Sequence, residues 1–428
     1  MASVKPDAES INRKTALICL AVVLLAGTFL RLPPALFSPK PAPLHSLAAF
    51  HPNPKWHELG FVGPDEELYR DYVNQLRAIQ LGHYPDIVRD YIEKQAAISG
   101  AILPPLRFLF IFAGFAWQSI FHSEALVALR NVASFFSILT LGLTSVLAWR
   151  IRGPIWSVAL TALVAFAPTQ LHMSQHALVD GFFTFWAVLT LWLLWENLQS
   201  PREWHWLVGY AMAVTALVLT KETAFFVSAA IVVILVANRW LRFGYVTPQL
   251  LIATILGPLA GVIILTTLAG GVNALITAYH FFVTKNYSLP YQVRTGDGPW
   301  YRYVVDLFLV SPLVLILAVC ALFRINRTKL AEIFLLVFLA TTYAMMCNVK
   351  YGMNLRFVNM WDVPLRFLAL SAIASLVAPL QRYRALAFGI IVAFVCAVEL
   401  RQYQILFVDH SLYELDSAGL FRALNIVK

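Results

Sequence analysis

Long apolar runs, separated by short polar connections, are the feature that most restricts how this chain can fold. They recur along nearly the whole sequence, and hydrophobic residues make up 60% of it. A helix of about twenty apolar residues matches the hydrocarbon thickness of a bilayer, and it satisfies its own backbone hydrogen bonds there. The sequence therefore predicts an all-α integral membrane protein and excludes an ordinary soluble domain.

About eleven of these runs are long enough to be transmembrane helices. Their approximate limits are 15–37, 131–149, 153–171, 181–198, 204–219, 223–239, 248–269, 304–323, 330–348, 360–380 and 385–401. The first run follows Arg13 and Lys14, and no small-x-small cleavage site comes after it, so we expect a retained anchor rather than a signal peptide. We interpret residues 1–428 as a single polytopic domain.

Basic residues mark one side of the membrane. Alternate connections between the predicted spans carry Arg150, Arg152, Arg202, Arg239, Arg242, Arg324, Arg327, Lys329, Arg382 and Arg384. The positive-inside rule makes that side cytoplasmic, in a bacterial inner membrane or a plasma membrane. The N-terminus is then inside, while the first loop (38–130) and the C-terminal tail (403–428) are outside. Because these residues account for most of the net charge of +9, nucleic-acid binding is not expected.

The outer segments contain most of the remaining polar residues. In the first loop, a Pro/His-rich lead-in to Trp56 precedes two amphipathic stretches, 66–80 and 86–97, which we expect to be helices on the membrane surface. The aromatic stretch 103–121 is expected to be interfacial or re-entrant rather than spanning. Glycines and a proline in the loop 270–303 predict a flexible turn.

The C-terminal tail is short and amphipathic. Leu420, Phe421, Leu424 and Val427 share one face, so we expect the tail to pack on the outer loops. The four cysteines all lie in apolar runs, which predicts neither a disulfide framework nor a metal site.

An acidic run, Gly-Pro-Asp-Glu-Glu at 63–67, lies in the first outer loop of a chain in which only 13% of residues are charged. Carboxylates next to the hydrocarbon boundary are costly unless they meet water, a cation or a reaction. The run is therefore a candidate functional site. Two plainer interpretations remain: a solvated loop, or a helix start at which Asp65 is only a cap.

The order of the motifs resembles a known family. A first span ends in Arg-Leu, Asp65-Glu66 is followed by Tyr69, Pro-Pro-Leu stands at 104–106, and Leu-Arg at 129–130 opens a helix. The turn His-Ala-Leu-Val-Asp at 176–180 and the turn Leu-Thr-Lys at 219–221 complete the pattern. The chain resembles the GT-C superfamily of membrane glycosyltransferases, in the branch of protein mannosyltransferases and aminoarabinose transferases. The resemblance implies a GT-C fold.

The implied activity is inverting transfer of a sugar, at the outer face of the membrane, from a polyprenyl-phosphate donor to a hydroxyl group of a glycan, lipid or protein. This chemistry needs a carboxylate that takes the acceptor proton and cations that stabilise the departing phosphate. Asp65 matches the position of the family's base. Glu66 is expected either to hold the acceptor or to orient Asp65.

The resemblance implies that Lys221 lies near the lipid phosphate and that Arg356 binds phosphate or sugar. Tyr69, His176 and Asp180 are the other substrate-binding candidates that it implies. Each has a plainer alternative. Lys221 could snorkel to the membrane interface. Arg356 could pair with Asp362, and Asp180 could belong to a buried polar turn.

No cofactor is expected. His172, His176 and Asp180 are spaced by four and could bind a divalent metal on a continuous helix, but we expect a turn there, which would separate them. The alternative function is a membrane transporter or lipid flippase. It is less favoured because the sequence has no convincing internal repeat and its polar residues gather at the outer rim.

Overall fold

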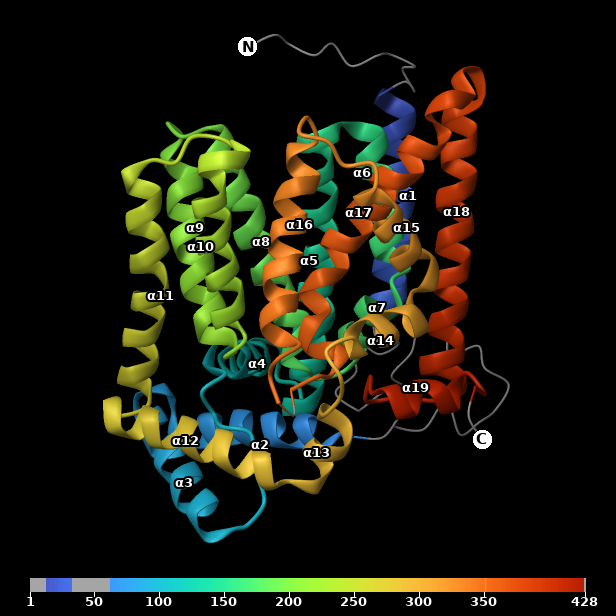
Figure 1. Ribbon diagram of the computed structural model, residues 1–428. Coiled ribbons are helices and arrows are strands. Elements are labelled where there is room, and N and C mark those ends of the chain that lie inside the picture. The colour runs from blue at the N-terminus through green and yellow to red at the C-terminus, as the bar shows by residue number, and fades with distance from the viewer. Residues whose placement is uncertain (1–12, 33–61, 351, 427–428) are drawn as a thin grey trace.

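The structure is a computed structural model that describes residues 13–32, 62–350 and 352–426. The lead-in to Trp56 and Val427 of the tail lie outside these ranges. The described chain is helical and contains no strand. Its helices form an upright bundle with a set of crosswise helices at one end (Figure 1).

The upright bundle corresponds to the predicted spans, except that the predicted span 304–323 is broken at Ser311 and only its second half is a bundle helix. Its helices are α1 (Arg13–Arg31), α5 (Ala125–Arg152), α6 (Pro154–Ala165), α8 (Val179–Gln199), α9 (Trp204–Thr220), α10 (Ala224–Leu241), α11 (Pro248–Leu268), α15 (Pro312–Leu322), α16 (Leu330–Met346), α17 (Asp362–Val377) and α18 (Arg384–Tyr403). Many large apolar side chains on these helices are exposed, including Ile255 on α11 and Ile390 on α18, as expected for surfaces that face lipid. The prediction of an all-α integral membrane protein is confirmed.

By length and apolar composition, six helical stretches of the described chain could cross a membrane, or seven if the bent pair α6 and α7 (Pro168–Gln175) is one span. The sixth is the continuous run 355–409, which includes both α17 and α18. Four shorter apolar helices are α4 (Phe108–Phe121), α9, α15 and α16. The span count of about eleven stays a prediction.

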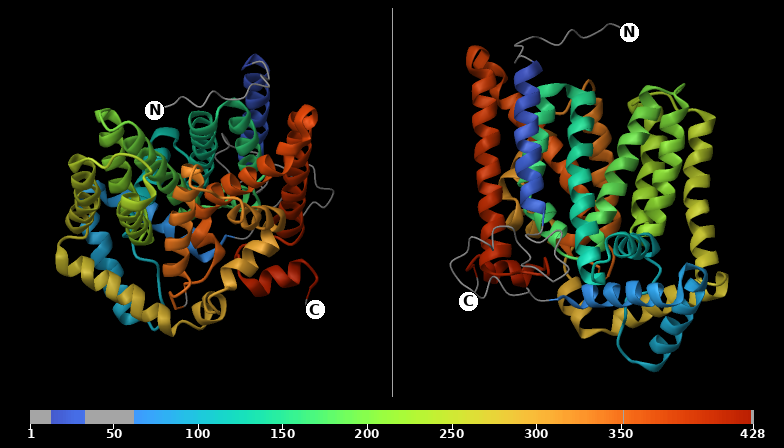
Figure 2. Two further views of the ribbon diagram at one scale, coloured as in Figure 1. Left: turned by 45° about the horizontal axis from the view of Figure 1, so that its top comes forward. Right: turned by 180° about the vertical axis from the view of Figure 1, so that it is seen from behind.

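The crosswise end is formed largely by the predicted outer segments. The two expected surface helices are α2 (Pro64–Ile79) and α3 (Tyr84–Ala97), and α4 also lies across this end of the bundle (Figure 2). The segment 270–303, expected to be a loop with a flexible turn, is helical over most of its length. It contains α12 (Val272–Ser288) and α13 (Pro290–Gly296) before the predicted turn, after which α14 (Arg302–Val310) begins. Gly271 lets α12 start, because its φ of 127° favours glycine.

The predicted third span is broken. Pro168 requires an extended residue before it, and Ala167 is extended, so α6 and α7 meet at a bend of 59°. At the break, the buried guanidinium of Arg31 donates to the carbonyl oxygens of Val164 and Ala165 at 2.9 Å. The Val164 oxygen also accepts from the Ala167 backbone N–H at 3.3 Å. The bend directs α7 toward the crosswise end, where the candidate residues lie.

The basic connections lie at the end of the bundle opposite α2 (Figure 1). The α5–α6, α8–α9, α10–α11, α15–α16 and α17–α18 connections all gather there, near the start of α1. The candidate residues Asp65 and Lys221 belong to the other end. This segregation is the arrangement that the positive-inside argument requires.

Candidate active site

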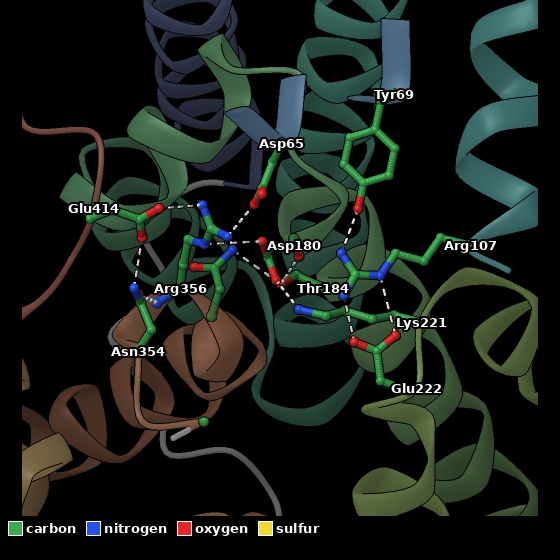
Figure 3. A network of polar contacts seen from close by, with 12 residues as sticks. Asp65, Tyr69, Arg107, Asp180, Thr184, Lys221, Glu222, Asn354, Arg356 and Glu414 are labelled. Carbon is green, nitrogen blue, oxygen red and sulfur yellow. Dashed lines mark hydrogen bonds and ion pairs between the residues drawn. The ribbon is translucent and has the colours of Figure 1, made fainter. Parts of the chain in front are cut away.

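Asp65 lies in the first turn of α2. Gly63 is the cap residue, Pro64 takes the first helical position, and the Glu66 side chain accepts a hydrogen bond from the Gly63 backbone N–H at 3.1 Å. The Asp65 side chain retains 20% of its exposure and forms an ion pair with Arg356 (Figure 3). Asp65 is therefore an accessible carboxylate with a fixed cationic partner.

Arg356 joins three carboxylates. Besides Asp65, its guanidinium faces Glu414, with Nη1–Oε1 at 3.1 Å, and Asp180, with Nε–Oδ2 at 3.8 Å. It lies on the short helix η4 (Leu355–Trp361) and is almost fully buried. The alternative pairing of Arg356 with Asp362 is wrong, because Asp362 forms its ion pair with Arg366, one helical turn later.

Lys221 follows the last residue of α9 and points into the protein. Its Nζ lies 2.5 Å from Oδ1 of Asp180 and 4.1 Å from the centre of the Phe357 ring. Burial lowers the pKa of Lys221, and the Asp180 carboxylate opposes that shift. The snorkelling alternative for Lys221 is therefore wrong.

Asp180 lies in the first turn of α8, where a carboxylate is favoured by the helix dipole. Its two oxygens face Lys221 and Arg356. Asp180 is buried, as the alternative of a buried polar turn requires, because its side chain is only 4% exposed. The same side chain brings the two candidate cations together.

A second ion pair, which was not predicted from the sequence, lies beside the first. Arg107 donates to Glu222 at 2.5 and 3.2 Å and to the hydroxyl oxygen of Tyr69 at 2.5 Å (Figure 3). Burial raises the pKa of Tyr69, so this hydroxyl stays protonated. Both charged residues directly follow quoted motifs, Pro-Pro-Leu for Arg107 and Leu-Thr-Lys for Glu222, which is the signal that could have found them.

Glu66 is fully buried and forms a junction between helices. It pairs with Arg130 of α5 at 3.0 Å, accepts from the Ala177 backbone N–H at 2.7 Å, and lies 3.4 Å from Nδ1 of His176. Burial alone would raise the pKa of Glu66, but the charges of His176 and Arg130 outweigh it and the pKa is lowered. Of the two roles expected for Glu66, this geometry favours orienting Asp65 over holding the acceptor.

The three residues considered for a metal site do not lie on one helix. Helix α7 ends at Gln175 and α8 begins at Val179, so His172, His176 and Asp180 do not share one continuous helix. His172 instead donates from Nε2 to the Tyr413 carbonyl oxygen at 3.0 Å. Across the three described stretches of the chain, no three His, Cys, Asp or Glu side chains are arranged to hold a metal ion.

The C-terminal tail contributes two residues that the sequence analysis did not single out. After η6 (Gln404–Asp409) and before α19 (Ser417–Ala423), Tyr413 and Glu414 reach the site. The Tyr413 ring packs edge-on against His176 with centroids 5.1 Å apart, and a side chain at Gly63 would overlap it. The expectation that the tail packs on the outer segments is supported by these contacts and by the burial of Leu420.

The fold is shared with two solved membrane enzymes. ArnT from Cupriavidus metallidurans, in the apo state, is 12% identical with a TM-score of 0.53, and the match covers 97% of this chain and 76% of ArnT. The oligosaccharyltransferase AglB from Archaeoglobus fulgidus is 14% identical with a TM-score of 0.55, and the match covers 95% of this chain and 57% of AglB. Both have the GT-C fold, and the expectation of that fold is confirmed.

Sequence similarity agrees with the fold. Residues 72–284 match the model of the dolichyl-phosphate-mannose-protein mannosyltransferase family. Among curated proteins, none matches this sequence. The fold and the family match together identify the chain as a membrane glycosyltransferase of the GT-C superfamily. They give no support to the transporter alternative. The matched segment includes Asp180 and Lys221 but not Asp65 or Arg356.

Proposed function

We propose that this glycosyltransferase moves a sugar from a polyprenyl-phosphate donor to a hydroxyl acceptor, with inversion at the anomeric carbon, at the outer face of the membrane. The observation that carries the proposal is the convergence of Asp65, Asp180, Lys221 and Arg356 at one end of the bundle. A partly exposed carboxylate beside two buried cations is the arrangement that this reaction needs.

In the proposed reaction, the acceptor oxygen attacks the anomeric carbon while the bond between that carbon and the lipid phosphate oxygen breaks. The hydroxyl proton passes to the Asp65 carboxylate. The electron pair of the broken bond stays with the lipid phosphate, whose added negative charge is stabilised by Lys221 and Arg356. Since Asp65 is paired with Arg356 in the structure, a phosphate that takes over Arg356 also releases the base.

The carrier is inferred from the relatives. One structure of ArnT from Cupriavidus metallidurans is bound to undecaprenyl phosphate, and one of AglB from Archaeoglobus fulgidus is in complex with a dolichol-phosphate. The same class of donor fits a pair of buried cations at the end of an apolar bundle. The location of the basic connections at the opposite end supports an outer-face site and a cytoplasmic N-terminus.

Transfer from undecaprenyl-phosphate sugars by the purified chain tests the proposal. Asp65→Asn keeps the size of the side chain but removes the base, so we expect turnover to fall by about 10²- to 10⁴-fold. Asp71→Asn is the matched control, because Asp71 lies on the same helix with half of its side chain exposed and we expect its turnover to stay near normal. Normal turnover by folded Asp65→Asn protein would assign the base to another carboxylate.

A further inference from the structure

We propose that Glu414, on the C-terminal tail, is a positioning residue that occupies Arg356 in place of the donor phosphate. The Glu414 side chain moves off Arg356 when the donor binds. After sugar transfer it returns and displaces the polyprenyl phosphate product. This inference rests on the proposed function and deepens it, because it specifies how the site releases its negatively charged lipid product.

The Glu414 carboxyl group accepts hydrogen bonds from two donors. Its Oε1 accepts from Nη1 of Arg356 at 3.1 Å, and its Oε2 accepts from the side-chain amide of Asn354 at 2.7 Å (Figure 3). The Asn354 side-chain oxygen in turn accepts from the Arg356 backbone N–H at 3.1 Å, which fixes the amide. A phosphate has the same need for a guanidinium and a neighbouring neutral donor.

The charges at the site require one carboxylate to withdraw. Among the described residues, three carboxylates face Arg356, and the buried cations that meet them are Arg356 and Lys221. Arg107 is matched by Glu222. A donor phosphate adds further negative charge, and the repulsion between this charge and the carboxylates falls if one carboxylate leaves Arg356.

Glu414 is the carboxylate best placed to leave. Asp65 is needed as the base, and Asp180 is nearly inaccessible and bound to Lys221 at 2.5 Å. The Glu414 side chain is 18% exposed. The backbone on both sides of it is fixed: the Tyr413 carbonyl oxygen accepts from His172, and Leu415 is fully buried. Rotation of the Glu414 side chain alone therefore exchanges the two anions.

The expected effect follows from competition. If Glu414 occupies Arg356 for about nine-tenths of the time without donor, the apparent affinity for lipid phosphate is about tenfold below the intrinsic value. Glu414→Gln removes the competing charge with little change of shape. We expect it to bind undecaprenyl phosphate about tenfold more tightly, and to lower both the donor KM and kcat because the product leaves more slowly.

The test measures binding of undecaprenyl phosphate to the purified full chain in detergent, with undecaprenol as the uncharged probe. Asp409→Asn is the matched control, since it removes one carboxylate from an exposed position on the same tail. We expect Glu414→Gln to tighten binding of the phosphate but not of the alcohol, and Asp409→Asn to change neither. Glu414→Asp, whose carboxylate reaches Arg356 less well, is expected to lie between wild type and Glu414→Gln.

Three outcomes would overturn the inference. Equal phosphate affinity in wild type and Glu414→Gln overturns it and leaves the proposed function standing. Weaker phosphate binding by Glu414→Gln, with normal binding by Asp409→Asn, shows instead that Glu414 holds Arg356 in its working position. Failure of wild type and all variants to bind undecaprenyl phosphate overturns both this inference and the proposed carrier.

Discussion

Glu66→Gln is predicted to cost this protein more stability than removal of any other carboxylate from α2. The charged pair between Glu66 and Arg130 is buried, with none of the Glu66 side chain exposed. Breaking such a pair by neutralising one partner costs about 3–5 kcal/mol, because the other charge stays buried. Glutamine retains one acceptor oxygen, so we expect a loss of stability at the lower end of this range, about 3 kcal/mol. Equilibrium unfolding of the purified protein in detergent measures the loss.

Glu67→Gln is the control for this prediction. Glu67 is the next residue, its side chain is 60% exposed, and its pair with Arg70 lies on the surface. Exposed pairs contribute at most about 1 kcal/mol. A double-mutant cycle that combines Glu66→Gln with Arg130→Gln should give a coupling free energy of about 2–3 kcal/mol. Equal stabilities for the two glutamine variants, or a coupling free energy near zero, would show that the buried pair does not stabilise the fold.

The Glu66 pair also predicts a dependence on pH. The pKa of Glu66 is lowered in the folded protein, so its stabilising contribution is fully present above the unfolded value of about 4.5 and is lost as pH falls through the folded value. The stability difference between wild type and Glu66→Gln should therefore be constant near neutral pH and shrink in acid. A difference that grows in acid would contradict the lowered pKa.

Three further predictions concern the site and the fold. Lys221→Met should lower turnover by about 10²- to 10³-fold with a smaller change in donor affinity, since a developing charge is stabilised most in the transition state, and single-turnover kinetics would separate the two. Gly63→Ala should push the Tyr413 ring away from α2 and lower both turnover and melting temperature, whereas Gly82→Ala, in open space, should lower neither. Arg31→Gln should destabilise the protein by about 2–4 kcal/mol, because the carbonyl groups at the α6–α7 break lose charged donors, and a variant as stable as wild type would contradict that role.

The helices were largely predictable from the sequence, because a bilayer requires long apolar runs and prolines mark where several helices begin. Pro154 and Pro248 start α6 and α11 within one residue of the predicted limits. The break at Pro168 was not predicted, since hydropathy alone reads 153–171 as continuous. The helix α12 was also missed, because its residues carry no strong amphipathic pattern and the nearby glycines indicated a turn.

The candidate residues were partly predictable. The resemblance singled out Asp65, Asp180, Lys221 and Arg356, which the structure brings together, but their catalytic and binding roles stay predictions. The pairings could not be foreseen, since Arg356 and Asp65 are 291 residues apart and only the packing of the bundle sets their contact. Glu414 carries no motif at all, so nothing in its local sequence distinguishes it from an ordinary tail carboxylate.

The contact between Gly63 and Tyr413 has a consequence for biosynthesis. The site needs residues from both the first and the last described outer segments, so a nascent chain that has inserted most of its helices still lacks the Tyr413 ring that packs on the start of α2. Glu414 likewise joins Arg356 only after translation has passed the last helix of the bundle. Incomplete translation products would therefore contain Asp65 and the start of α2 without the tail contacts that complete the candidate site.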